Sequence, residues 1–282
     1  MISIVTISMN QGQFLPTAVD SVLSQRGVDV EYVIVDAGST DGSREYLATL
    51  RDSRVRLVLE PDHGPAEGLN KGVRSTNGAV VGYLNADDVY LEGALRGVDD
   101  VFRREPWVDV VYGDGWIIDG DNRVLRHFES TPWGLRQYLY GGVSVLQQST
   151  FFRRGAFDRT AGFNTLNVTC WDGELLVDLA LAGARFHHVR ADWSAFRLHS
   201  EGISGSGRLE ARYQEDRRRF VARTIGRRPS PIDPVLGLSA RGAKLVRSPG
   251  YALRRLRSRS PAGSRIEHGP DGYVVRSDLA RT

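Results

Sequence analysis

The chain of 282 residues carries a formal net charge of +3, with 41% hydrophobic and 25% charged residues. A chain of this length and composition can bury a large core, which excludes a mostly disordered protein. The small net charge argues against bulk binding of nucleic acid, although basic residues gather in the last quarter of the chain.

Cys170 is the only cysteine, so the chain cannot form an intramolecular disulfide, and this fits a reducing cytosol. Met1 leads directly into an apolar stretch, without a basic segment or a signal-cleavage site. No apolar run approaches the length of a membrane span. We therefore expect a cytoplasmic protein, soluble or peripheral on the inner face of the membrane.

The first ninety residues alternate short apolar runs with stretches in which apolar residues recur at helical spacing. The apolar runs predict strands over residues 2–7, 30–35, 55–59 and 79–84. The helical spacing predicts helices over residues 14–23, 45–50 and 64–74. This alternation predicts a parallel sheet with helices on both faces.

Three of these predicted strands end in acidic residues. Asp36 follows the second strand, Glu60 and Asp62 follow the third, and Asp87 and Asp88 follow the fourth. Parallel strands bring such ends to one edge of the sheet, where ligands bind in open α/β proteins. Clustered carboxylates there suit Mg²⁺ or Mn²⁺ with a phosphate completing the shell. Alternatively, each acid only caps the helix that follows it.

The second half predicts a sheet of mixed character. A helix is expected over 91–104, and strands over 108–112, 116–118 and 124–128. Residues 119–122 (Asp-Gly-Asp-Asn) are a strong hairpin signal between the last two of these strands. Further on we expect a strand over 149–153, a helix over 173–181 and strands over 186–189 and 193–198.

Beyond Arg217 the composition becomes basic, and Pro229, Pro231 and Pro234 interrupt the helical pattern. Residues 251–259 combine arginines with leucines. Such a segment could lie on an anionic membrane surface. A solvated helix or a partly disordered tail would explain the same composition equally well.

Five short motifs follow one another along the chain: residues 5–10 (Val-Thr-Ile-Ser-Met-Asn), 33–42 (Val-Ile-Val-Asp-Ala-Gly-Ser-Thr-Asp-Gly), 83–88 (Tyr-Leu-Asn-Ala-Asp-Asp), 148–152 (Gln-Ser-Thr-Phe-Phe) and 196–199 (Phe-Arg-Leu-His). In order and spacing they resemble the family 2 glycosyltransferases of the glycosyltransferase-A (GT-A) fold. The resemblance implies an α/β fold with a mixed, mostly parallel central sheet, helices on both faces and a Rossmann-like nucleotide-binding half.

The resemblance covers residues 1 to about 205 and implies a domain plan. A catalytic domain would span 1–225, with a nucleotide-sugar-binding half over 1–115 and an acceptor half over 116–225. A basic C-terminal extension would span 226–282. We expect the acceptor to contact the irregular segments 131–144 and 163–170.

The resemblance also implies a donor site. Asp36 would accept a hydrogen bond from the nucleobase, usually uracil, and Asp88 would face the sugar. Asp87 would bind a divalent cation, Mn²⁺ or Mg²⁺, with His199 completing the metal site; a structural histidine is the alternative. The full set of implied donor-binding residues is Thr6, Ser8, Asn10, Asp36, Gly38, Asn70, Lys71, Asn85, Ala86, Asp87 and Asp88. The sequence departs from the family where Asn85 replaces the usual first aspartate.

Residues 171–174 (Trp-Asp-Gly-Glu) match the second acidic motif of the family. By this match Asp172 would be the catalytic base, with Glu174 as the alternative, and Trp171 and Glu174 would contact the acceptor. A carboxylate in that place can take the proton of an attacking hydroxyl. Asp172 could instead cap the helix that follows.

The implied function is that of an inverting, metal-dependent transferase. It would move a sugar from a nucleotide-diphosphate donor, UDP-linked, to a hydroxyl of a glycan, a lipid-linked sugar or a small molecule, in polysaccharide or glycoconjugate synthesis. A sugar nucleotidyltransferase is one alternative, but residues 10–13 (Asn-Gln-Gly-Gln) lack the basic residue that its phosphate loop needs. The other is a non-catalytic nucleotide-sugar-binding subunit of a membrane-associated assembly.

Overall fold

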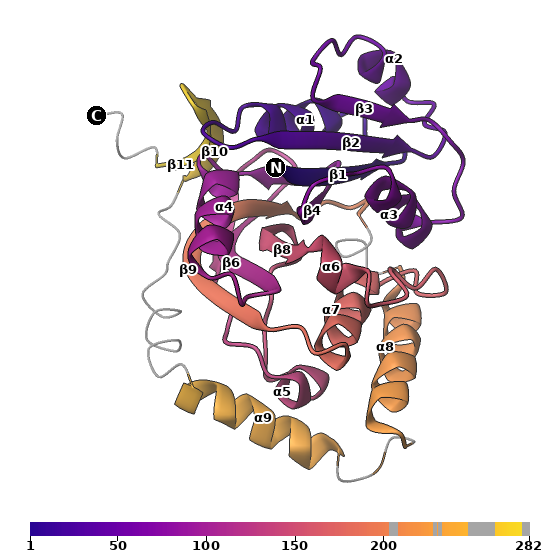
Figure 1. The fold of residues 1–282 in the computed structure, drawn as a ribbon, viewed down its shortest axis with the longest axis vertical. Helices are drawn as coiled ribbons and strands as arrows, with labels where there is room; N and C mark the ends of the chain where they lie inside the picture. The colour runs from indigo at the N-terminus through magenta and orange to yellow at the C-terminus, as the bar shows by residue number, and fades with distance from the viewer. Residues whose placement is uncertain (203–207, 228–229, 231–232, 248–262, 278–282) are drawn as a thin grey trace.

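A sheet of nine strands runs through the computed structural model, which describes residues 1–202, 208–227, 230, 233–247 and 263–277 (Figure 1). The strand order is β3-β2-β1-β4-β8-β6-β9-β5, with β7 paired to β6. The strands are β1 Ile2–Ser8, β2 Val30–Asp36, β3 Val55–Val58, β4 Val80–Asn85, β5 Val89–Tyr90, β6 Val110–Ile118, β7 Val124–Phe128, β8 Thr150–Arg153 and β9 Phe186–Arg197.

The half of the sheet made of β3, β2, β1 and β4 is entirely parallel, as the sequence predicts. Its register places Ser8 opposite Asp36, and Ile7 opposite Asn85. The carboxyl ends of these strands therefore share one edge of the sheet. Apolar β-branched residues make this half because both of its faces are buried.

The other half of the sheet is mixed. β8 lies antiparallel to β4 and β6, β7 folds back on β6 in the predicted hairpin, and β9 runs parallel to β6. The prediction of separate strands over 108–112 and 116–118, and over 186–189 and 193–198, is wrong. Each pair is one strand, because β6 and β9 go on pairing although their register shifts on both sides of Asp114. Gly113 leaves room there for the ring of Trp193.

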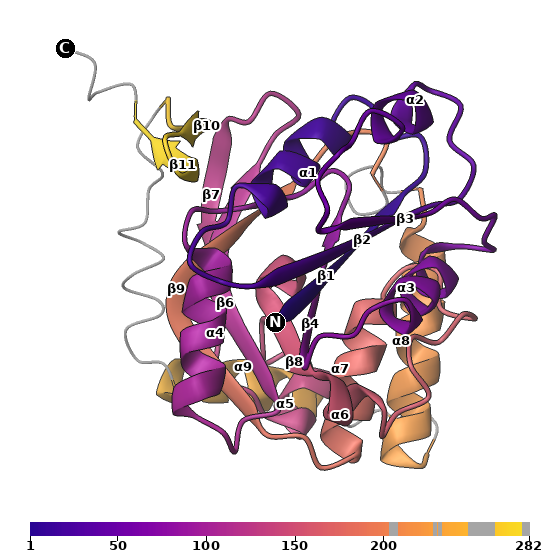
Figure 2. The same ribbon diagram turned by 45° about the horizontal axis from the view of Figure 1, so that its top comes forward.

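Helices cover both faces of the sheet (Figures 1 and 2). On one face α1 (Leu15–Leu23) and α4 (Ala94–Arg104) pack against residues such as Ile4 and Leu84. On the other face α3 (Pro65–Arg74), α6 (Arg154–Phe157) and α7 (Trp171–Leu181) pack against Val5 and Tyr83. The short α2 (Ser43–Leu47) follows β2.

Two short elements lie between β7 and β8, and the first of them falls in the segment 131–144 that the sequence predicts to be irregular. They are α5 (Leu135–Leu139) and the 3₁₀ turn η1 (Gln147–Ser149). α5 contributes Leu139 to a small core with Val177 of α7 and Phe220. A five-residue helix carries too few periodic positions to be recognised from the sequence.

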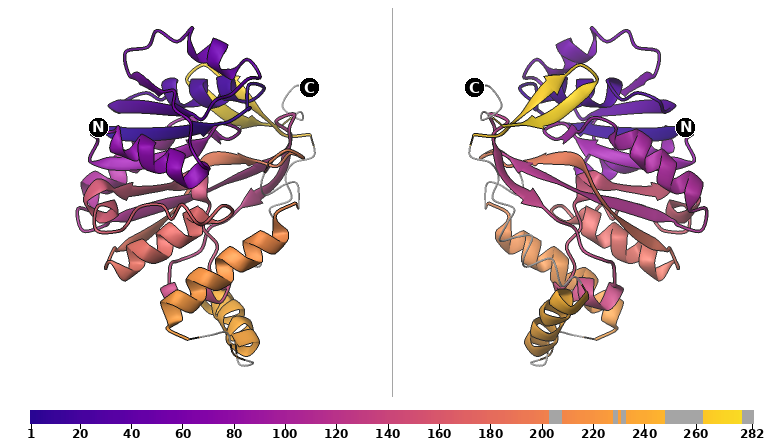
Figure 3. Two further views of the ribbon diagram at one scale, coloured as in Figure 1. Left: turned by 90° about the vertical axis from the view of Figure 1, so that its right-hand side faces the viewer. Right: turned by 90° about the vertical axis from the view of Figure 1, so that its left-hand side faces the viewer.

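The C-terminal part of the chain packs against elements that precede it. α8 (Glu210–Ile225) packs along α7, and α9 (Asp233–Arg247) follows it at the far side of the molecule (Figure 3). The hairpin of β10 (Arg265–Gly269) and β11 (Gly272–Arg276) docks on the other side, where the Tyr273 hydroxyl donates to Asp20 Oδ2 at 3.0 Å.

The basic segment 251–259 lies outside the described residues. Within the described part of the chain, no helix combines the length and apolar character needed to cross a membrane.

Candidate active site

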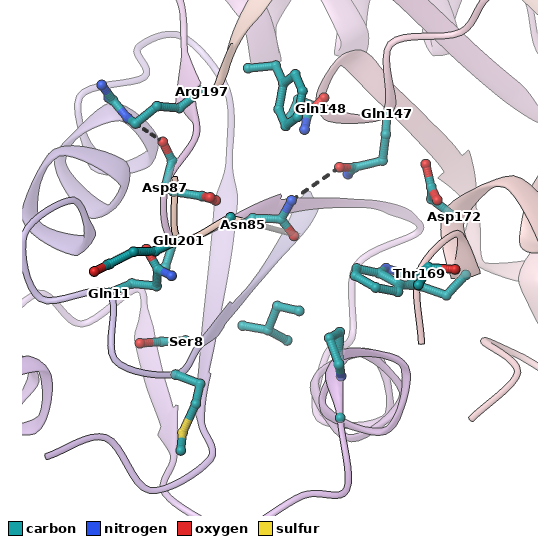
Figure 4. A pocket seen from close by; sticks show the side chains of 18 of the residues that line it. Ser8, Gln11, Asn85, Asp87, Gln147, Gln148, Thr169, Asp172, Arg197 and Glu201 are labelled. Carbon is teal, nitrogen blue, oxygen red and sulfur yellow. Dashed lines mark hydrogen bonds between the residues drawn. The ribbon is translucent and has the colours of Figure 1, made fainter. Parts of the chain in front are cut away.

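A cavity of about 560 Å³ opens at the carboxyl edge of β1 and β4. Its volume lies within the range of sites that bind small molecules. Its polar lining includes Ser8, Asn85, Asp87, Gln147, Asp172 and Arg197. Figure 4 shows Asp87 and Arg197 on one side of this cavity, Asp172 on the other, and Asn85 between them. Segments more than eighty residues apart thus converge on one space.

Asp87 and Asp88, which follow β4, point in different directions. Asp87 lines the cavity, whereas Asp88 is fully buried. The Asp88 carboxylate accepts hydrogen bonds from Gln148 Nε2 at 2.8 Å, Arg197 N at 2.9 Å and Asn85 Nδ2 at 3.1 Å. Burial, and then the charge of Asp87, raise the pKa of Asp88 well above its usual range, and these hydrogen bonds oppose that rise. Asp88 therefore holds the turn together and, contrary to expectation, does not line the cavity.

Two buried oxygens on the cavity wall have no hydrogen-bond partner among the described residues. They are Ser8 Oγ and Asn85 Oδ1. Buried polar atoms in folded proteins are nearly always hydrogen-bonded, so these two oxygens fit a ligand that would supply the missing partners. Both residues belong to the predicted donor site.

Asp87 meets His199, which the sequence paired with it in a metal site. His199 Nε2 lies 3.0 Å from Asp87 Oδ2, and the imidazole packs on Phe14 with ring centroids 4.8 Å apart. No group of three or more His, Cys, Asp or Glu side chains suited to a metal occurs in the part of the chain that the structure describes. One carboxylate and one imidazole fit a cation that takes its remaining ligands from bound phosphates and water.

Arg197 lines the cavity and belongs to the motif at 196–199, but the sequence analysis assigned it no role in the site. Its Nε donates to Asp87 O at 2.7 Å and its Nη1 to Asp119 O at 2.9 Å, while the guanidinium lies over the Phe14 ring. Burial lowers its pKa from the ordinary value, and the charges of Asp88 and Asp87 oppose that change. Arg197 thus ties the turn after β4 to the β6–β7 hairpin.

Asp172, the predicted base, lies in the first turn of α7 and lines the cavity. It forms no ion pair within the described ranges of the chain. Burial raises the pKa of Asp172, although the backbone N–H groups of Gly173 and of Asp172 itself lower it in part. A carboxylate with a raised pKa and no cationic partner is suited to accept a proton.

Glu174 does not lie where the sequence analysis expects it. It is buried behind Asp172 and accepts hydrogen bonds from Asn167 Nδ2 at 2.8 Å and Asn164 Nδ2 at 2.9 Å. Arg219 of α8 approaches to 3.4 Å. Glu174 therefore does not line the cavity. Trp171 lines the cavity with part of its ring and packs the core with the rest.

Asp36 is buried beneath the turn that follows β2. It accepts hydrogen bonds from Arg44 Nε at 2.7 Å, from Ser39 Oγ at 2.6 Å and from the N–H groups of Ser39 and Gly38. Burial would raise the pKa of Asp36, but these bonds outweigh it and hold the pKa below its usual range. Ala37 is the residue of this turn that lines the cavity.

Four other predicted donor residues support the walls without lining the cavity. Thr6 is buried and accepts from the Tyr32 hydroxyl, and Asn10 accepts from Thr40 N. Asn70 exchanges two hydrogen bonds with the backbone of Phe163, and Lys71 pairs with Glu67 at 3.0 Å. Ala86, by contrast, lines the cavity as expected. The lining also includes Asp62 and Thr169, from a predicted acidic strand end and a predicted acceptor segment, and four residues without a predicted role, namely Gln11, Gln147, Gln148 and Glu201.

Known proteins resemble this chain in sequence and in fold. The family described as Glycosyl transferase family 2 matches residues 3–158. An uncharacterized glycosyltransferase of Nostoc sp. is 33% identical over 213 residues, which cover 70% of this chain and 65% of that relative.

Two solved structures share the fold. Residues 1–349 of S. aureus TarS in complex with UDP-GlcNAc superpose with a TM-score of 0.65 at 16% identity, covering 90% of this chain and 75% of that one. The mannosyltransferase PcManGT from Pyrobaculum calidifontis, in complex with GDP-Man and Mn²⁺, gives a TM-score of 0.60 at 19% identity, covering 89% and 75%. These likenesses confirm the predicted GT-A fold.

Proposed function

The chain belongs to glycosyl transferase family 2, and from that premise we propose that it transfers a sugar from a UDP-linked donor to a hydroxyl acceptor with inversion, in polysaccharide or glycoconjugate synthesis. The observation that carries the proposal is the placement of Asp87 and Asp172 on opposite sides of one cavity. Single displacement needs a site for the leaving diphosphate on one face of the sugar and a base on the other.

The donor side of the cavity supplies polar groups without bound partners. Ser8 Oγ and Asn85 Oδ1 are positioned to take hydrogen bonds from the donor, and Arg197 contributes a positive charge to the same wall. A divalent cation held by Asp87 and His199 would neutralise the charge that develops on the diphosphate, an effect worth several kcal/mol.

The acceptor side carries the base. As the acceptor oxygen bonds to the anomeric carbon, the bond from that carbon to the donor phosphate breaks and nucleoside diphosphate leaves. The proton of the acceptor hydroxyl passes to the Asp172 carboxylate. The raised pKa of Asp172 makes it a stronger base than an exposed aspartate, which favours this transfer.

The choice of donor rests on likeness. TarS is complexed with UDP-GlcNAc and PcManGT with GDP-Man and Mn²⁺, so both nucleotides belong in a test. Turnover of UDP-glucose, UDP-galactose, UDP-GlcNAc and GDP-mannose should be compared in Mn²⁺, in Mg²⁺ and in EDTA. We expect release of UDP from one UDP-sugar, only with a cation present.

Asp87→Asn should reduce this turnover at least about 100-fold, because the cation loses its charged ligand. The matched control is Asp100→Asn on α4, which removes a partly exposed carboxylate outside the cavity and should leave turnover unchanged. Faster turnover of GDP-mannose would contradict the UDP assignment, and full activity in EDTA would contradict the cation.

A further inference from the structure

A second cavity, of about 280 Å³, borders the first at the predicted base. The two cavities share Thr169 and Asp172. The lining of the second cavity includes Tyr138, Thr169, Cys170, Asp172, Tyr213 and Arg217. It thus combines residues from both segments that the sequence predicts to contact the acceptor with residues of α8. The volume is near the lower limit for ligand sites, about 300 Å³, and suits a single small ring better than a long chain.

Arg217 gives this cavity its charge. Its Nη2 donates to Leu139 O at 2.9 Å. Within the described residues Arg217 forms no ion pair, in contrast to its neighbours on the same helix: Arg212 approaches Asp216 at 3.2 Å and Arg219 approaches Glu174 at 3.4 Å. A partly buried guanidinium without a carboxylate partner favours an anionic ligand, because such a pair can form two charge-assisted hydrogen bonds.

Two phenol groups lie beside this guanidinium. Burial raises the pKa of Tyr138 and of Tyr213, and in both cases the positive charge of Arg217 acts in the opposite direction. Both hydroxyls stay protonated at neutral pH and can donate or accept hydrogen bonds. The cavity therefore presents one cation and two phenols, with the Asp172 carboxylate at its border.

We propose that this second cavity binds the acceptor, and that the acceptor carries an anionic group, a carboxylate or a phosphate, which Arg217 recognises. This inference rests on the proposed function. The anionic group held by Arg217 leaves the nucleophilic hydroxyl directed toward Asp172. The phenols of Tyr138 and Tyr213 contact the body of the acceptor between these two points.

The test compares charged and neutral probes on the full chain saturated with UDP and Mn²⁺, so that the donor cavity is filled. Saturation-transfer NMR would measure binding of methyl β-glucuronide against methyl β-glucoside, and of glycerol 3-phosphate against glycerol. At least one anionic probe should bind about tenfold or more tightly than its neutral counterpart. The pair that shows the preference identifies carboxylate or phosphate as the recognised group.

Arg217→Gln should abolish this preference, whereas Arg218→Gln, an exposed arginine on the next position of the same helix, should retain it. Equal binding of charged and neutral probes to the unaltered protein would overturn the inference, as would a preference that survives Arg217→Gln or a lack of binding by both anionic probes. These comparisons on the unaltered protein hold even if Arg217→Gln does not fold. Absence of UDP binding would instead overturn the proposed function.

Discussion

The turn after β4 and the first turn of α7 each place one carboxylate at the cavity, but different contacts support the two turns. Each carries two carboxylates close in sequence, and in each one faces the cavity while the other is buried. Asp87 and Asp172 line the cavity, whereas Asp88 and Glu174 hold the turns in place. A carboxylate that faces a ligand site needs a rigid turn behind it, and the buried partner provides that rigidity.

The two buried carboxylates differ in what holds them. Among the described residues, Asp88 accepts only from neutral donors on the sheet side, including Gln148 and the backbone of Arg197. Glu174 accepts from two asparagines and lies within 3.5 Å of Arg219 and Arg223 of α8. The turn after β4 is therefore supported by the sheet itself, whereas the first turn of α7 depends on a helix from the C-terminal part of the chain.

The largest expected effect is on the transfer rate, and it distinguishes the role of Asp172 from that of Asp87. Asp172→Asn removes the proton acceptor, so the transfer rate should fall about 10²–10⁴-fold. The affinity for UDP should not change, because the proposed donor site lies on the other side of the cavity. Steady-state kinetics and calorimetric titration with UDP measure the two quantities. Asp178→Asn on the same helix, outside the cavity, is the control, and an unchanged rate in Asp172→Asn would remove this residue from the mechanism.

The two supporting carboxylates should differ in stability. Glu174→Gln places an amide N–H₂ group against donors from Asn167 and Arg219, and should lower the free energy of unfolding by about 1–3 kcal/mol. Arg219 and Arg223 are partly exposed, so the ion pairs that they form with Glu174 contribute only a small part of this loss. Asp88→Asn should lose less, about 1 kcal/mol or under, because the amides of Asn85 and Gln148 can rotate to accept. Urea denaturation measures both, and equal losses would contradict the contrast.

Crowding the contact between α5 and α7 should lower the free energy of unfolding by a smaller amount. A Cβ added at Gly173 would lie 2.5 Å from the Tyr138 hydroxyl oxygen, so Gly173→Ala should lose about 1–2 kcal/mol through overpacking. Adding Tyr138→Phe removes the hydroxyl and should recover most of that loss. A double-mutant cycle followed by thermal unfolding gives the coupling, and additive losses would show that the two residues do not interact.

The smallest effect concerns pH. Because burial raises the pKa of Asp172, the acidic limb of kcat/KM should lie above the ordinary aspartate value of about 4, with activity rising as the base ionises. The same raised pKa means that the folded state holds this proton more tightly than the unfolded state. Stability should therefore fall slightly as pH rises through that window, and Asp172→Asn should remove this fall. A limb at the ordinary value would contradict the shift.

The sequence predicts the parallel half of the fold and the edge that carries the site. Apolar runs ending in acids can be read directly, because each strand and its terminal residue are adjacent in the chain. Which acid of a pair faces the cavity cannot be read in this way. The orientation of Asp88 depends on Gln148 and Arg197, and that of Glu174 on Arg219, all distant in sequence.

The resemblance also assigned to the donor site some residues that support the cavity wall and do not line the cavity. Asn70 is one example, since its side chain is fully engaged with the backbone of Phe163 across 93 positions of the chain. The C-terminal hairpin was not predicted, although the Gly-Pro-Asp-Gly stretch at 269–272 is a turn signal. Its five-residue strands are too short to stand out beside a basic, proline-interrupted segment.

The thiol of Cys170 can report whether the second cavity is occupied. It is the single thiol of the sequence and lines the second cavity. Burial raises its pKa to about 11, against weaker opposing hydrogen bonds from Thr169 and Asn167, so at neutral pH the thiol is protonated and reacts slowly with alkylating reagents. A molecule seated in that cavity would slow the reaction further, which makes the rate of maleimide labelling a gauge of occupancy in the unaltered chain.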